Sequence, residues 1–180
     1  MAQNKEECIR LLQSAINLLH DSEKWCSQAF IKAQMLGLQG EKRRERHEAR
    51  KGYMLMQYLQ GVAVDLFDTE IYPANSDASL PAIPDIPSYF NQYLMKLWKE
   101  YEGVHMIANE LVVKGYRKIS EQMYCYTDCL FDEIIDTRRT IKENTLANWE
   151  YHHTSRYQVS MKENVHDKFE DKEKAEGYKY

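Results

Sequence analysis

All four prolines of this 180-residue chain lie between Pro73 and Pro87, and the rest of the sequence contains none. Proline lacks a backbone N–H and breaks helix interiors, so this segment divides the chain into two proline-free halves. Each half has the periodicity of a long helical hairpin. The sequence therefore predicts an all-α fold: a four-helix bundle of two helical hairpins joined by a long proline-containing crossover.

Four stretches have apolar residues at alternating spacings of three and four, as amphipathic helices do. The predicted helices cover residues 4–36, 41–67, 88–114 and 120–144. Gly37 and Gly40 are expected to stop the first helix, Ser88 to begin the third, and Gly115 to form the last turn. A weaker pattern from Ala147 onward predicts an additional short fifth helix.

We expect one helical domain over residues 1–160, followed by a charged C-terminal tail over residues 161–180. Helices of this length form a bundle about 40 Å long at about 1.5 Å per residue. The linker over 68–87 can stretch about 60 Å at about 3.3 Å per residue, so it is long enough to run the whole bundle. This favours a topology in which the second and third helices are parallel.

One seam is predicted to face the core on each helix. The seam of the first helix contains a single charged residue, Glu23. The seam predicted for the third helix consists of Leu94, Trp98, Tyr101, His105, Ala108 and Val112.

Several seam and near-seam residues carry metal-binding groups. Glu102 and His105 form a Glu-x-x-His on the third helix, and Asp128 and Asp132 are predicted to lie level with them on the fourth. Together with the helical layout, these residues resemble the ferritin-like superfamily over about residues 5–160. In that family, Glu ligands and Glu-x-x-His pairs project into the bundle and hold two irons. The resemblance implies a site binding iron, manganese or zinc, with the candidate ligands Glu23, Glu102, His105, Asp128 and Asp132.

The second helix departs from the family pattern. Its mid-bundle residues, 53–57, read Tyr-Met-Leu-Met-Gln and include neither a carboxylate nor a histidine. The nearest candidates are Glu45, His47 and Glu48, which lie closer to the bundle end and form no Glu-x-x-His. The ferritin-like metal-dependent oxidase is therefore the alternative functional hypothesis.

The cysteines allow a second metal hypothesis. Cys125 and Cys129 are spaced i, i+4 on one helix face, and with Cys26 and His105 they have the ligand types of a zinc site. The competing interpretation is that they are small buried hydrophobic residues. Because no secretory signal precedes them, the four cysteines are expected to be reduced and the protein cytoplasmic.

The bulk composition excludes several classes of protein. The formal net charge of −4 provides no basic field for nucleic acid, and no apolar run approaches the roughly 20 residues that span a bilayer. No phosphate loop or nucleophile motif points to an enzyme.

The chain has 13 Tyr and 8 Met, residue types enriched at interfaces. The leading functional prediction is non-enzymatic protein–protein association, as a homo-oligomer or with a protein partner. The alternative is a ferritin-like metal-binding or iron-handling protein with an altered site.

Overall fold

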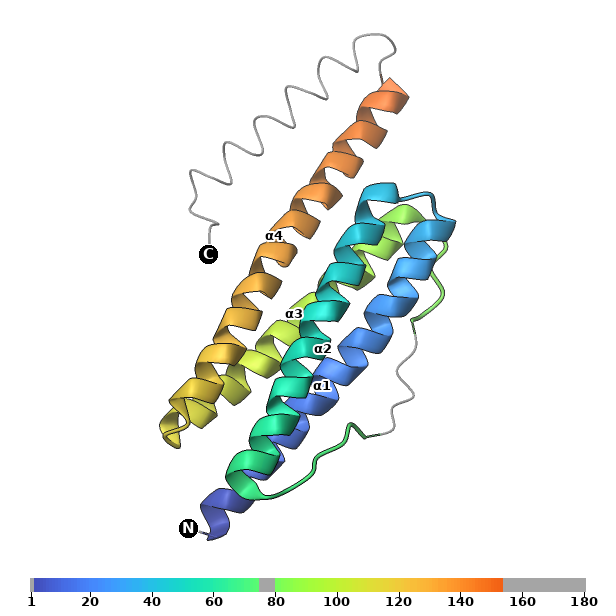
Figure 1. Ribbon diagram of the computed structural model, residues 1–180. Coiled ribbons are helices and arrows are strands. Elements are labelled where there is room, and N and C mark those ends of the chain that lie inside the picture. The colour runs from blue at the N-terminus through green and yellow to red at the C-terminus, as the bar shows by residue number, and fades with distance from the viewer. Residues whose placement is uncertain (1, 75–79, 154–180) are drawn as a thin grey trace.

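The computed structural model describes residues 2–74 and 80–153, without the side chains of 2–3, 39–49 and 144–153. The described residues form four α-helices and no strand. The helices are α1 (Ala2–Met35), α2 (Gln39–Phe67), α3 (Ile86–Val113) and α4 (Arg117–His153). The prediction of an all-α four-helix fold is confirmed (Figure 1).

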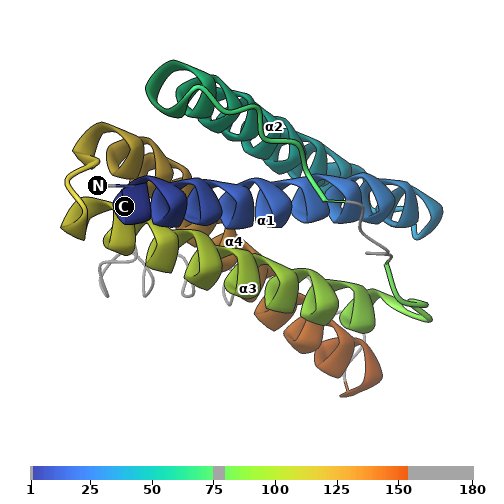
Figure 2. The same ribbon diagram turned by 90° about the horizontal axis from the view of Figure 1, so that it is seen from below.

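The helices pack as two hairpins. The contact of α1 with α2 is the most extensive in the bundle, followed by that of α3 with α4. The hairpins meet mainly through α1 and α3, and Figure 2 shows α1 lying between α2 and α3. The contact between α2 and α4 is the smallest of the four. The side of the bundle between α2 and α4 is therefore less tightly closed than the other three.

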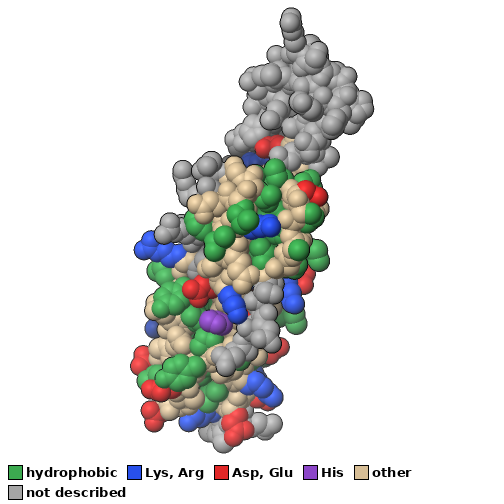
Figure 3. Space-filling view, turned by 90° about the vertical axis from the view of Figure 1, so that its right-hand side faces the viewer, with side chains coloured by type: hydrophobic (Ala, Val, Ile, Leu, Met, Phe, Trp, Pro, Cys, Tyr) green, Lys and Arg blue, Asp and Glu red, His purple; other side chains and the backbone are tan. Residues whose placement is uncertain are grey.

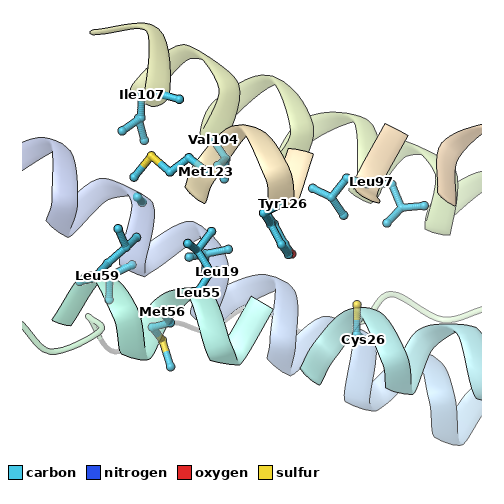
Figure 4. Close-up of a cluster of buried hydrophobic side chains, with 14 of the residues drawn as sticks. Leu19, Cys26, Leu55, Met56, Leu59, Leu97, Val104, Ile107, Met123 and Tyr126 are labelled. Atoms are coloured by element: carbon cyan, nitrogen blue, oxygen red, sulfur yellow. The ribbon is translucent and has the colours of Figure 1, made fainter. Parts of the chain in front are cut away.

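The core is built from aliphatic side chains in the middle and aromatic rings towards the start of α3. Leu19, Leu55, Leu59 and Met123 belong to the central cluster (Figure 4). Fully buried large side chains come from all four helices: Tyr89, Tyr93, Phe90, Leu12, Ile16, Leu19, Leu59, Leu97, Leu111, Met123, Leu130 and Ile134. Burial of this much apolar surface is the main force that holds the helices together.

The core seam of α3 lies one residue away from the predicted seam. Of the predicted seam, Ala108 is buried, Val112 is exposed, and the other four residues are half-buried: Leu94, Trp98, Tyr101 and His105. The row that enters the core, with the same spacing of four and three, is Tyr93, Leu97, Glu100, Val104, Ile107 and Leu111. Both rows are apolar enough to face a core, so periodicity alone did not separate them.

Local signals fix the helix ends. Gly37 (φ +78°) and Gly115 (φ +92°) form the turns after α1 and α3, as their positions predicted. Gly40 does not stop α1 as predicted, because it lies in the first turn of α2. The start of α3 differs from the prediction, because Asp85 rather than Ser88 caps the helix. The Asp85 carboxylate accepts a hydrogen bond of 2.8 Å from the backbone N–H of Ser88. This bond lowers the pKa of Asp85.

Helix α4 continues beyond the predicted end at Asn144 and reaches His153. Residues 147–153 therefore extend α4 and do not begin a separate helix. The remainder of the predicted fifth helix and the predicted tail over residues 161–180 lie outside the described residues.

The described parts of the connection between α2 and α3 lie against α1. Gln13 of α1 donates a hydrogen bond of 2.8 Å from Nε2 to the carbonyl of Tyr72. Further along α1, Gln28 accepts one from the backbone N–H of Leu80. The apolar anchors of the connection are the buried residues Ile71 and Ile83.

Polar contacts tie the start of α1 to the turn between α3 and α4. Lys114 donates a hydrogen bond to Glu7, and this pairing lowers the pKa of Glu7 and raises that of Lys114. Burial raises the pKa values of the neighbouring Cys8 thiol and Tyr116 hydroxyl, which also interact with each other. The second hairpin is thus held to α1 at this end of the bundle.

The turn glycine Gly115 gives a direct test of this backbone. Replacing Gly115 with Ala should destabilise the protein by about 1–2 kcal/mol, because L-residues with a side chain disfavour positive φ. The matched control is Gly61→Ala in α2, where a new Cβ meets nothing within 4 Å. That change should stabilise the helix by about 0.5–1 kcal/mol. Urea unfolding followed by circular dichroism measures both, and effects of the same sign would contradict the assigned turn.

Candidate functional site

The structure does not gather the five residues of the ferritin-like metal hypothesis into one cluster. Glu102, Asp128 and Asp132 are exposed, whereas Glu23 and His105 are half-buried on different helices. In the part of the chain that the structure describes, no three or more His, Cys, Asp and Glu side chains are grouped so that they could hold a metal ion.

His105 packs among aromatic rings. Its imidazole stacks on Tyr101 of the same helix, with ring centroids 5.4 Å apart, and lies 5.3 Å from the ring of Tyr124 on α4. Within the described residues, its buried Nδ1 has no hydrogen-bond partner. His105 therefore packs between α3 and α4 as one of a group of aromatic rings.

The four residues of the zinc hypothesis are also distributed over the fold. Cys26 is in the core with 2% of its surface exposed, and His105 lies between α3 and α4. Cys125 is exposed on α4, and Cys129 is half-buried one turn later. Of the four residues, only Cys125 and Cys129 lie close together, on the same helix.

A buried polar pair lies at the centre of the bundle. Tyr126 of α4 donates a hydrogen bond of 2.9 Å to Oε2 of Glu100 on α3, and Glu100 is 1% exposed. A side chain at Gly52 of α2 would place its Cβ 3.1 Å from the Tyr126 hydroxyl. The absence of a side chain at Gly52 thus leaves space for the Tyr126 hydroxyl, which donates the hydrogen bond to the buried Glu100 carboxylate. Sequence reasoning missed Glu100, although its position in the four-and-three row from Leu97 to Val104 was a readable signal.

Tyr126 also lines an open groove of about 390 Å³ between α2 and α4. We call this the α2–α4 groove. Its lining consists of Lys51, Met54, Leu55, Tyr58, Gln122, Cys125, Tyr126 and Cys129. Apolar and sulfur-containing side chains dominate, and Lys51 is the only charged residue among them. The groove occurs where the two hairpins have their smallest contact.

The solvent side of α2 is unusually apolar between Gly52 and Val64. From Gly52 to Val64 the helix contains no charged residue and no histidine. Among the described residues, five of the twelve exposed large hydrophobic side chains belong to α2, including Met54 (61% exposed), Val64 (45%) and Tyr53 (43%). We call the exposed residues of this strip the α2 outer face: Tyr53, Met54, Gln57, Tyr58, Gly61 and Val64.

Another face of the molecule has ordinary surface chemistry. In Figure 3, hydrophobic, acidic and basic side chains are interspersed over the side that lies on the right of Figure 1. Mixed charges of this kind create no strong field for a polyanionic ligand. The apolar strip on α2 therefore stands out by composition.

Comparisons with protein-family models, with curated proteins and with solved structures found no match. Among the described residues, no helix combines the length and the apolar character needed to cross a membrane.

Proposed function

We propose that this protein works by protein–protein association and that the α2 outer face is its contact surface. The observation that carries the proposal is the strip of thirteen residues from Gly52 to Val64 without charge on a solvent-facing helix. Interface cores are depleted of Lys, Glu and Asp and enriched in Tyr and Met. The strip has this composition on its exposed side, where burial against the rest of the bundle does not explain it.

A second copy of the chain fits this surface. In a two-fold symmetric contact the same strip is present on both sides, and residues i and j of one copy meet j and i of the other. A strip of one charge sign would therefore face the same sign, which disfavours association. The exposed side chains here are neutral, with Gln57 able to donate and accept hydrogen bonds at the same contact. Two α2 helices packed across a two-fold axis would bury Tyr53, Met54, Tyr58 and Val64.

We also propose that the chain has the crossover layout of ferritin-like bundles, with α2 and α3 parallel. The support is that the α2–α3 connection is hydrogen-bonded along α1, first at Gln13 and then at Gln28. The dispersed positions of Glu102, Asp128 and Asp132 give no specific support to iron chemistry in this layout.

Charge introduced on the α2 outer face tests the association. We expect Tyr53→Lys combined with Val64→Lys to weaken self-association by about a hundredfold, because like charges would meet across the contact. Size-exclusion chromatography with light scattering over a wide concentration range measures the mass. The wild type should shift from one 21.4 kDa chain to two, and the variant should stay at one.

The matched control is Met106→Lys, which changes an exposed residue on α3 and should dimerise like the wild type. A wild type that remains monomeric at the highest concentration would argue against self-association. Unchanged dimerisation of the α2 variant would exclude the α2 outer face as the contact.

A further inference from the structure

Three sulfur-containing residues line the α2–α4 groove. Cys125 and Cys129 lie one helical turn apart on α4, and Met54 is on the facing helix α2. Residues spaced i, i+4 have Cβ atoms about 5–6 Å apart, a gap that two metal–sulfur bonds of about 2.3 Å can bridge. Both cysteines are free thiols. The groove therefore presents two thiols and a thioether to the same space.

The remaining lining determines which metal suits this space. Among the residues whose side chains the structure describes, the lining includes no His, Asp or Glu. Zinc takes four nitrogen, sulfur or oxygen ligands, and magnesium and calcium need oxygen. Thiolate and thioether ligands select soft ions such as monovalent copper. A site with two thiols, one thioether and an apolar surround matches Cu(I) better than any of these divalent ions.

We propose that the α2–α4 groove binds one Cu(I) ion through the thiolates of Cys125 and Cys129, with the Met54 thioether as third ligand. Binding forms the copper–sulfur bonds and releases two thiol protons, and copper stays monovalent throughout. Two thiolates and one Cu(I) carry a net charge of −1, and the described lining of the groove includes one basic residue, Lys51. The site shares Met54 with the α2 outer face, whereas both cysteines belong to α4.

The other two cysteines do not offer a competing site. Cys8 is 0% exposed near the α3–α4 turn, and Cys26 is 2% exposed in the core. These two thiols can therefore stay in place as internal references when the groove is altered.

Titration with Cu(I) alone tests the site on the full chain. The ion is supplied without oxygen to reduced protein, and a chromophoric Cu(I) chelator competes for it. We expect one Cu(I) per wild-type chain, and an affinity at least about a hundredfold lower for Cys125→Ser combined with Cys129→Ser. X-ray absorption at the copper edge should report three sulfur ligands in the wild type and two in Met54→Leu.

The matched control is Met95→Leu, an exposed methionine on α3, which should keep three sulfur ligands. Helical circular dichroism verifies that each variant is folded. Equal copper affinity of the wild type and the double serine variant would overturn the site. Two sulfur ligands in the wild type would overturn the role of Met54, and tighter binding of Zn(II) than of Cu(I) would overturn the choice of metal.

Discussion

Replacing Leu19 with Ala should reduce the free energy of unfolding by about 2–5 kcal/mol, because it removes a fully buried side chain and leaves a cavity. Leu19 lies in the central cluster near Leu55 and Tyr126, where α1, α2 and α4 come together (Figure 4). Packing there is fixed by three helices, so collapse around the cavity is limited. Urea denaturation followed by circular dichroism measures the change.

Leu66→Ala is the matched control, since it makes the same substitution at a side chain that is 57% exposed. It should change the free energy of unfolding by no more than about 0.5 kcal/mol. Similar losses at Leu19 and Leu66 would contradict the packing of α1 into the centre of the bundle.

Tyr126→Phe should destabilise the protein by about 1–3 kcal/mol, although it removes only one hydroxyl group. The hydroxyl donates to Oε2 of Glu100 in a buried environment, and removing the donor takes a hydrogen bond from a carboxylate that is shielded from water. Chemical unfolding of the variant measures the loss.

Tyr124→Phe is the control on the same helix. The Tyr124 hydroxyl donates to Asn109 on the exposed surface, where water can replace it, so the cost should stay below about 0.5 kcal/mol. A double-mutant cycle with Glu100→Gln should give a non-zero coupling between residues 100 and 126. If the two Tyr→Phe variants lost equal free energy of unfolding, the buried hydrogen bond to Glu100 would contribute no more than the exposed one to Asn109.

The helices were predictable because their signals are local. Prolines between Pro73 and Pro87 exclude a continuous helix there, and Gly37 and Gly115 supply the positive φ that ends α1 and α3. The start of α3 was missed by two residues, because a proline tolerated in the first turn allowed Asp85 to cap the helix.

The candidate sites were less predictable. On α3 two neighbouring rows have helical spacing, and the predicted seam was the row with Trp98 and His105. The structure buries the row with Leu97 and Glu100 instead. This shift of one residue, a rotation of about 100°, is why His105 was placed at the bundle centre and Glu100 was overlooked.

The pairing of the two cysteines on α4 follows from sequence, because i, i+4 residues share a helix face in any fold. The approach of Met54 and Lys51 to that pair does not, since it depends on which helix of the first hairpin lies beside α4. The sequence likewise did not predict that one side of the strip from Gly52 to Val64 is exposed. Its apolar composition is equally consistent with a buried helix.

The sequence by itself determined the four helices and the division into two hairpins, because backbone geometry, proline and glycine act within a few residues. Tertiary structure decided which row of α3 enters the core, which side of α2 meets water and which side chains share the α2–α4 groove. Those choices depend on how much apolar surface each arrangement buries against the other helices, and that quantity is a property of the whole bundle and cannot be read from any single helix.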